Sequence, residues 1–257
     1  MKKTIGLVLI DTSAPTLAAN AIRISMEQFK FDSVTVFSDE PNAYPGLRCI
    51  EIEKMHSALD YSNFVIRKLP EFIVDDFILI IHYDGFILNG NEFSPHFFHY
   101  DYIGAPWLSD PDFPVGNGGF SWRSKKLCDA IKALANGESL TEPEDVYICK
   151  VHRKNLEKNY GIFFADASIA LHFSYEHEAP RFSTFGFHGA FHLPYLYNRT
   201  LAWLVDHLPD RMMVAEDITT QVFKYHLGLV SSDAAKLHEA AMLARGEAAA
   251  LNRSILK

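Results

Sequence analysis

The stretch Phe77-Ile-Leu-Ile-Ile-His82-Tyr83-Asp84-Gly85 decides which fold the rest of the chain is expected to adopt. Its run of five apolar residues predicts a strand that is buried on both faces, as in a parallel sheet. The run ends in ionisable residues and a glycine, and ligands of open α/β sheets bind at the carboxyl edge of the strands.

His82 and Asp84 are two residues apart, so their side chains point to the same side while the chain stays extended. A carboxylate beside an imidazole can bind a divalent metal ion. The alternative is a strand end whose polar residues simply meet water, and this stretch alone leaves both interpretations open.

Strands and helices alternate around this stretch. Apolar runs predict further strands, and helical spacing predicts helices between them, at residues 5–10, 17–29, 33–37, 48–52 and 57–69. This alternation predicts βαβ units and a mostly parallel, Rossmann-like sheet in roughly the first 90 residues. The dinucleotide fingerprint G-x-G-x-x-G is absent after the first strand, which argues against a nicotinamide enzyme.

The composition is that of a soluble globular protein, with 257 residues of which 48% are hydrophobic and 22% charged. The formal net charge of -8 argues against a nucleic-acid partner. Three widely spaced cysteines, Cys49, Cys128 and Cys149, fit a reducing compartment, so we expect a cytoplasmic protein. No apolar run approaches the roughly 20 residues of a membrane span.

The middle of the chain is rich in turns and acids. Gly116-Asn117-Gly118-Gly119 permits positive φ and close backbone approach, although Asn-Gly also favours a simple hairpin turn. A helix is expected from residue 124 to about residue 136, closed by Gly137. Thr141 and Glu144 match a capping box at the start of another helix.

Toward the C-terminus the pattern changes from strand to helix. Apolar and small residues between positions 161 and 174 predict one or two strands. Helices are expected at residues 201–208, 218–229 and 234–256. We therefore expect a domain at residues 1–195 and a helical extension at 196–257 that packs on it and offers a surface for a homo-oligomer or a protein partner.

Five segments, taken in order, resemble the GT-A glycosyltransferases. More narrowly, they resemble an uncharacterised family of predicted nucleotide-sugar transferases that is defined only as a domain of unknown function. The segments are Ile80–Gly85, Tyr102–Trp107, Gly116–Ser124, Pro143–Cys149 and Phe185–Gly189. The resemblance implies an α/β fold of the GT-A class, a Rossmann-like mixed sheet flanked by helices, with the C-terminal helices as an addition.

The resemblance also implies roles for single residues. Asp84 and His188 correspond to metal contacts, while His82 stands where the first acid of D-x-D is expected, which is a departure from the pattern. Asp145, with Glu144 beside it, corresponds to the catalytic base. The donor sugar and acceptor are expected against Trp107, Gly116, Asn117, Gly118 and Gly119.

The implied reaction moves a sugar from a nucleotide-diphosphate sugar, a UDP-sugar by analogy, to a hydroxyl of a glycan acceptor. A hard divalent cation neutralises the charge of the leaving diphosphate, and a histidine ligand favours Mn²⁺ over Mg²⁺. With Asp145 as base, the expected outcome is a single inverting displacement. We expect a role in surface or secreted glycan synthesis, in the cytoplasm or at the inner membrane face.

Nucleotide contacts follow from the same correspondence. Asp11 and Thr12, after the first strand, are expected near the base, and Asp39 near base or ribose. Arg67 and Lys68 are expected near the diphosphate or, as the alternative, on a solvated helix face.

Two other functions are open at this point. One is a metal-dependent hydrolase that uses His82, Asp84, Asp101 and His188, with water as acceptor. The other is a catalytically inactive nucleotide-sugar-binding or scaffold protein, which the missing first acid at His82 favours and the retained Glu144-Asp145 pair opposes.

Overall fold

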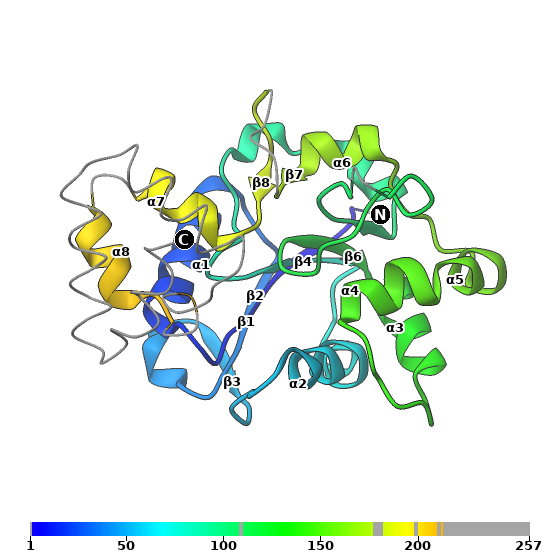
Figure 1. The fold of residues 1–257 in the computed structure, drawn as a ribbon, viewed down its shortest axis with the longest axis horizontal. Helices are drawn as coiled ribbons and strands as arrows, with labels where there is room; N and C mark the ends of the chain where they lie inside the picture. The colour runs from blue at the N-terminus through cyan, green and yellow to red at the C-terminus, as the bar shows by residue number, and fades with distance from the viewer. Residues whose placement is uncertain (1, 108–109, 177–181, 198–199, 210–211, 213–257) are drawn as a thin grey trace, which may run out of the picture. The chain divides into compact units, whose positions relative to one another are not determined.

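The computed structural model describes residues 2–107, 110–176, 182–197, 200–209 and 212 (Figure 1). The chain divides into two compact units, Met1–His188 and Gly189–Lys257, and each is described by itself. The helices expected at residues 218–229 and 234–256 lie outside the described residues. The expected domain boundary after residue 195, and the role of the extension, therefore stay predictions.

A six-stranded mixed sheet forms the centre of the first unit, with the strand order β3-β2-β1-β4-β6-β5. Strands β1 to β4 run parallel, while β6 is antiparallel to both β4 and β5. The bounds are β1 Ile5–Ile10, β2 Ser33–Ser38, β3 Arg48–Glu51, β4 Phe77–Ile81, β5 Tyr102–Ile103 and β6 Ser121–Ser124. This mixed α/β sheet, in which β6 runs opposite to the other five strands, confirms the predicted fold class.

Strands β1 and β4 are adjacent, and every residue of both is buried. Alternate residues of a strand point to opposite faces of the sheet. Val8 and Ile80 belong to one apolar cluster with Val65, which follows α2, and Cys128 of α3. Helices α2 (Ala58–Asn63) and α3 (Lys125–Leu134) thus cover one face of the sheet (Figure 1).

The remaining helices and short strands of this unit complete the fold around the sheet. Their bounds are α1 Pro15–Gln28, α4 Glu144–Val146, α5 Arg153–Tyr160, α6 Ala167–Phe173, β7 Ser174–Tyr175 and β8 Gly186–Phe187. Two π-helical turns, Phe64–Lys68 and Tyr147–Val151, continue α2 and α4 without a break. In the second unit the described helices are α7 Leu193–Leu196 and α8 Leu201–His207.

Most predicted elements are confirmed, and one is wrong. Half of the segment between residues 161 and 174 forms helix α6, and its only strand contacts are an isolated bridge at Phe164 and the start of β7 at Ser174. Asp166 caps this helix, because its carboxylate accepts a hydrogen bond from the amide of Ile169 at 3.0 Å. The cap was visible in the sequence, but the apolar residues of a seven-residue helix give too short a pattern to separate helix from strand.

Within the described residues, no helix combines the length and the apolar character that crossing a bilayer would require. The three cysteines are free, and Cys128 and Cys149 are buried.

Candidate metal centre and active site

Strand β4 ends in a tight turn that brings two predicted metal ligands to the edge of the sheet. The amide of His82 donates to the carbonyl of Gly85 at 2.9 Å, and the Gly85 amide donates back to the His82 carbonyl at 3.2 Å. The extended strand therefore stops at Ile81, and His82 and Asp84 lie beyond its carboxyl end. This is the edge of an open α/β sheet at which ligands bind.

His82, Asp84 and His188 form one group that can hold a metal ion. One ligand atom of each residue lies within 4.8 Å of those of the other two. His188 is the residue directly after β8, and its Nε2 lies 3.7 Å from Asp84 Oδ1. The fold thus brings together the three residues predicted as metal ligands from two distant parts of the chain.

The backbone of Gly119 provides the space in which these ligands meet. A Cβ atom on residue 119 would lie 2.1 Å from His188 Nε2 and 2.8 Å from His82 Nδ1. These two nitrogen atoms therefore converge on a volume that any side chain at residue 119 would fill. Two imidazole nitrogens and one carboxylate are a donor set suited to a divalent first-row transition metal, so the residues fit such an ion.

The electrostatics of the group favour a cation. Burial lowers the pKa of His188, but nearby carboxylates, with Asp84 the strongest, outweigh burial and raise it to about 9. Glu176 and Asp145 contribute to the same rise. Because a metal ligand must be an unprotonated nitrogen, a bound metal would displace this proton and take its place among the carboxylates.

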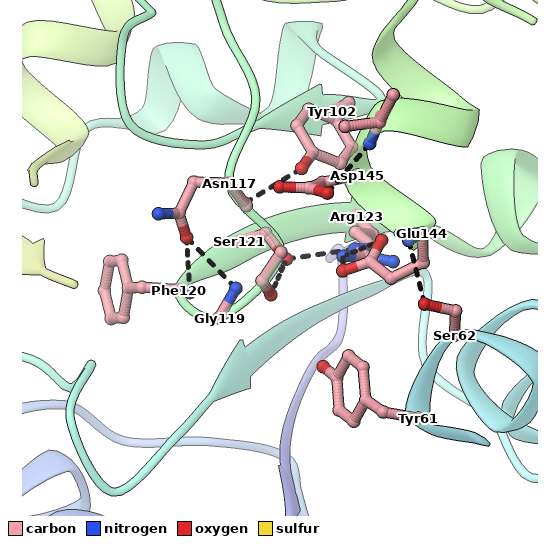
Figure 2. Close-up of polar contacts among 12 residues, drawn as sticks. Tyr61, Ser62, Tyr102, Asn117, Gly119, Phe120, Ser121, Arg123, Glu144 and Asp145 are labelled. Carbon is pink, nitrogen blue, oxygen red and sulfur yellow. Dashed lines mark hydrogen bonds and ion pairs between the residues drawn. The ribbon is translucent and has the colours of Figure 1, made fainter. Parts of the chain in front are cut away.

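Asn117 contacts both the metal group and the backbone of the glycine loop, and Figure 2 shows its bonds to the loop. Its φ is 68°, in the left-handed region that Asn tolerates better than most residues. Its Oδ1 accepts hydrogen bonds from the amides of Gly119, at 3.0 Å, and Phe120, at 3.3 Å. Its Nδ2 lies 2.8 Å from Nδ1 of His188. The loop and His188 are therefore held in one arrangement.

Trp107 packs against the same loop. A Cβ on residue 116 would lie 1.9 Å from Cζ2 of Trp107, so the indole lies directly on the backbone of Gly116. Lys150 Nζ lies 4.6 Å from the ring centroid, which is within the range of a cation–π contact. Trp107 thus borders the loop as predicted, and its contact with a sugar stays a prediction.

Glu144 lies in a buried ion pair beneath the glycine loop (Figure 2). Both of its carboxylate oxygens are 2.9 Å from Nη2 of Arg123, whose Nε donates to Ser121 Oγ. The two charged side chains are only 2% and 4% exposed. Gly118 is needed here, because a Cβ at residue 118 would lie 1.5 Å from Glu144 Oε1.

Each charge of this pair favours the ionised form of the other, although burial has the larger effect on Glu144 and its pKa is raised overall. Burial lowers the pKa of Arg123, but the Glu144 carboxylate outweighs burial and raises it. Burial raises the pKa of Glu144, and Arg123 opposes that rise. The capping box predicted from Thr141 and Glu144 is wrong, because Arg123 takes the Glu144 carboxylate and Pro143 is the N-cap residue.

Asp145 is half-buried at the start of α4, next to the ion pair. Its Oδ1 accepts a hydrogen bond from the amide of Val146 at 2.8 Å. Its charge raises the pKa of His188, which places it within electrostatic reach of the metal group. The start of α4 is itself fixed, because the Glu144 amide donates to Ser62 Oγ at 3.0 Å.

Two residues predicted to contact the nucleotide lie at the end of β1, and both accept hydrogen bonds from other groups of the chain. The buried Asp11 carboxylate accepts from the amides of Ser13 and Ala14 and from the hydroxyls of Ser13 and Tyr44. Burial nevertheless raises the pKa of Asp11. Thr12 Oγ1 accepts from the amide of Met55 at 3.1 Å. Both residues shape the loop before α1, and a direct contact with a base stays a prediction.

The other predicted nucleotide contacts differ in their surroundings. Asp39 follows β2 and lies 3.7 Å from Lys54 Nζ. Arg67 donates to the carbonyls of Ala135 and Glu138, after the end of α3, and so joins two helical segments. Lys68 is exposed, as the solvated-face alternative expected. The role of these residues in diphosphate binding is a prediction that this geometry does not test.

Asp101 lies at the other end of β4 from the metal group. Its carboxylate accepts from Ser124 Oγ at 2.5 Å, and Ser124 pairs with Phe77, the first residue of β4. Among the described residues, the group that can hold a metal contains His82, Asp84 and His188 without Asp101. The four-residue hydrolase site expected as an alternative is therefore not assembled.

Three residues of this site were missed by reasoning from the sequence. Arg123 pairs with Glu144, Tyr61 with His82, and Glu176 with His188. Arg123 had one visible signal, since it lies in a segment of otherwise apolar and small residues, where a charge needs a partner. Tyr61 and Glu176 had none, because a single tyrosine or glutamate in a helix or loop forms no local pattern that indicates its partner.

The family model described as "Protein of unknown function (DUF5672)" matches residues 46–188, which is more than half of the chain. The match includes the metal group, the glycine loop and the start of α4. A comparison with curated protein sequences found no match.

Solved structures that match part of this chain include glucosyl-3-phosphoglycerate synthase from Mycobacterium tuberculosis in complex with Mn²⁺ and UDP-glucose. That match has 12% identity and a TM-score of 0.35, and it covers 49% of this chain and 57% of the synthase. A mycobacterial protein matches with 10% identity and a TM-score of 0.33, covering 49% of this chain and 54% of its own. The chain thus spans little more than half of the length of these structures.

Replacing one partner of the buried ion pair should destabilise the fold. Arg123→Met should lower the free energy of unfolding by about 3–5 kcal/mol, because it leaves the Glu144 carboxylate buried and unpaired. The double variant Arg123→Met/Glu144→Leu should recover most of that loss. Urea unfolding measures both, and Glu27→Gln, which breaks the exposed Arg23–Glu27 pair, should change stability by less than about 0.5 kcal/mol. A single variant as stable as this control would contradict the assigned role.

Filling the space above Gly119 should prevent metal binding. Gly119→Ala places a methyl group where His82 Nδ1 and His188 Nε2 converge, so Mn²⁺ titration should show a loss of binding of at least about tenfold. Gly137→Ala is the matched control, since its added Cβ meets no atom within 4 Å and only the backbone at φ 83° is strained. Unchanged Mn²⁺ affinity in Gly119→Ala would place the metal elsewhere.

Proposed function

This chain belongs to the DUF5672 family, and we propose that it is a metal-dependent glycosyltransferase that uses a nucleotide-diphosphate sugar as donor. One observation supports this proposal most directly. His82 Nδ1, Asp84 and His188 Nε2 converge over a glycine at the carboxyl edge of the sheet, and Asp145, at the start of α4, is close enough to raise the pKa of His188. A metal ligand set and a nearby general base are the two parts that such a transfer needs.

Asp84, His82 and His188 are the residues that would hold the metal. When bound, a divalent cation neutralises the negative charge that develops on the diphosphate as the glycosidic bond breaks. Two nitrogen ligands and one carboxylate favour Mn²⁺ over Mg²⁺, which prefers an all-oxygen environment. Glu176 adds a second carboxylate near His188 and increases the attraction for a cation.

Asp145 is assigned as the base that takes the proton from the acceptor hydroxyl. One carboxylate oxygen, Oδ1, is oriented by the Val146 amide, and a carboxylate has a second oxygen that can accept a proton. Glu144 is assigned a positioning role instead, since both of its oxygens face Arg123. With one base and no covalent intermediate, the transfer is a single displacement that inverts the anomeric centre.

The glycine loop is assigned to the donor sugar and acceptor. Gly116, Gly118 and Gly119 let the backbone approach Trp107, Glu144 and the metal group, and Asn117 fixes the loop between them. The favoured donor is a UDP-sugar and the acceptor a glycan hydroxyl. We extend the proposal to a precursor of a surface or secreted glycan, made in the cytoplasm.

Donor binding is the first test of this function. In thermal unfolding with Mn²⁺ and a panel of nucleoside diphosphates, one nucleotide at 100 times its Kd should stabilise the protein by about 2.7 kcal/mol. Asp84→Asn should remove the metal-dependent part of this effect, and the surface change Asp129→Asn should not. Stabilisation by no nucleotide of the panel would contradict a nucleotide-sugar donor.

The role of Asp145 can be tested separately. Asp145→Asn should lower the rate of sugar transfer by about 10²–10⁴-fold, because the amide cannot accept the hydroxyl proton. Donor binding, followed by the same unfolding shift, should stay unchanged, and Asp129→Asn again serves as the control. An Asp145→Asn variant with full transfer activity would exclude this residue as the base, and a free sugar as the only product would indicate a hydrolase.

A further inference from the structure

Each of the two imidazole rings in the metal group is held from behind by a second side chain. His82 Nε2 lies 2.8 Å from the hydroxyl of Tyr61. His188 Nδ1 lies 3.1 Å from Oε1 of Glu176. In both rings the other nitrogen is the one that faces the space above Gly119.

We infer that Tyr61 and Glu176 are positioning residues that turn His82 Nδ1 and His188 Nε2 toward a common divalent cation. This inference rests on the metal centre of the proposed function and adds to it the side chains that determine its affinity. An imidazole that binds a metal through one nitrogen has its proton on the other. That N–H needs an acceptor, and a hydroxyl or carboxylate oxygen supplies it while fixing the plane of the ring.

Tyr61 belongs to α2, and its position is defined by the packing of that helix. The tyrosine and His82 rings meet edge to face, with centroids 5.0 Å apart and an interplanar angle of 84°. The next residue, Ser62, accepts the amide of Glu144. Two consecutive residues of one short helix therefore contact the metal ligand His82 and the start of α4, where Asp145 lies. This arrangement fixes the distance between the metal group and Asp145.

Glu176 and His188 are brought together by strand pairing. Strand β7 pairs with β8 in parallel, with Tyr175 opposite Phe187, so the next residue of each strand is Glu176 and His188. The amide of His188 donates to the carbonyl of Tyr175 at 2.9 Å, which extends the pairing by one residue. The register of two short strands thus places a carboxylate beside a metal-binding imidazole.

Asn117 Nδ2 also lies near His188 Nδ1, at 2.8 Å. Its amide orientation is determined by Oδ1, which accepts two backbone N–H groups, so Asn117 presents N–H groups to the ring. A ring nitrogen that has its own proton cannot accept from Asn117, but it can donate to Glu176. With a metal on Nε2, Nδ1 keeps its proton and donates to Glu176, whereas the contact with Asn117 requires Nδ1 without a proton and belongs to the neutral, metal-free ring that is protonated on Nε2.

The test is Mn²⁺ affinity of the full chain, measured by electron paramagnetic resonance titration. Tyr61→Phe and Glu176→Gln should each weaken Mn²⁺ binding by about 10–100-fold. The thermal unfolding midpoint without metal should stay close to that of the wild type. Tyr147→Phe, which removes a tyrosine hydrogen bond to Glu138, and Glu71→Gln, which breaks an exposed pair with Lys132, are matched controls and should bind Mn²⁺ normally.

The outcomes separate this inference from the proposed function. If the wild type binds Mn²⁺ and both variants bind it equally tightly, the positioning roles are overturned while the metal centre stands. If the wild type binds no Mn²⁺, the metal centre itself is overturned, and this inference with it. Nitrogen hyperfine coupling from two imidazoles in wild-type Mn²⁺ spectra, weakened in the two variants, would support the assigned roles.

Discussion

The buried ion pair between Arg123 and Glu144 is the constraint on which the arrangement of the site depends. Two opposite charges that are almost fully removed from water must stay together, because separating them would leave an unpaired charge in the interior. Arg123 belongs to β6 of the sheet, and Glu144 is the first residue of α4. The pair therefore connects the central sheet to the helix that begins with Asp145.

The glycine loop is shaped by the same constraint. It passes over the Glu144 carboxylate, and residue 118 has no room for a side chain there. One residue further on, Gly119 leaves open the space between the two imidazoles. A structural requirement and a ligand-binding requirement thus meet in neighbouring residues, and Asn117 fixes the backbone that serves both.

The fold and part of the site could be predicted from the sequence because their signals are local. The apolar run of β4, and the acid and imidazole that follow it, lie within nine consecutive residues. The side chains that pair with the site residues could not be predicted in this way. Arg123 and Glu144 are 21 residues apart, as are Tyr61 and His82, and Glu176 and His188 are 12 apart.

A local sequence pattern can fit one interaction of a side chain while the folded chain gives that side chain another partner. The Thr141–Glu144 spacing fits a capping box, yet a charge buried 21 residues away is the stronger partner for Glu144. Asp11 follows a strand at a position suited to a ligand, and its carboxylate also accepts hydrogen bonds from its own turn and from Tyr44, so its contact with a base stays a prediction. Such outcomes depend on which groups the folded chain brings close, which a local pattern does not contain.

The central claim is that one divalent cation binds His82 Nδ1, Asp84 and His188 Nε2 above Gly119. Anomalous diffraction from crystals soaked in Mn²⁺ tests it most directly. We predict a single strong peak in contact with those three ligand atoms. A peak at a different group of side chains, or no peak at this one when the ion is bound in solution, would contradict the claim.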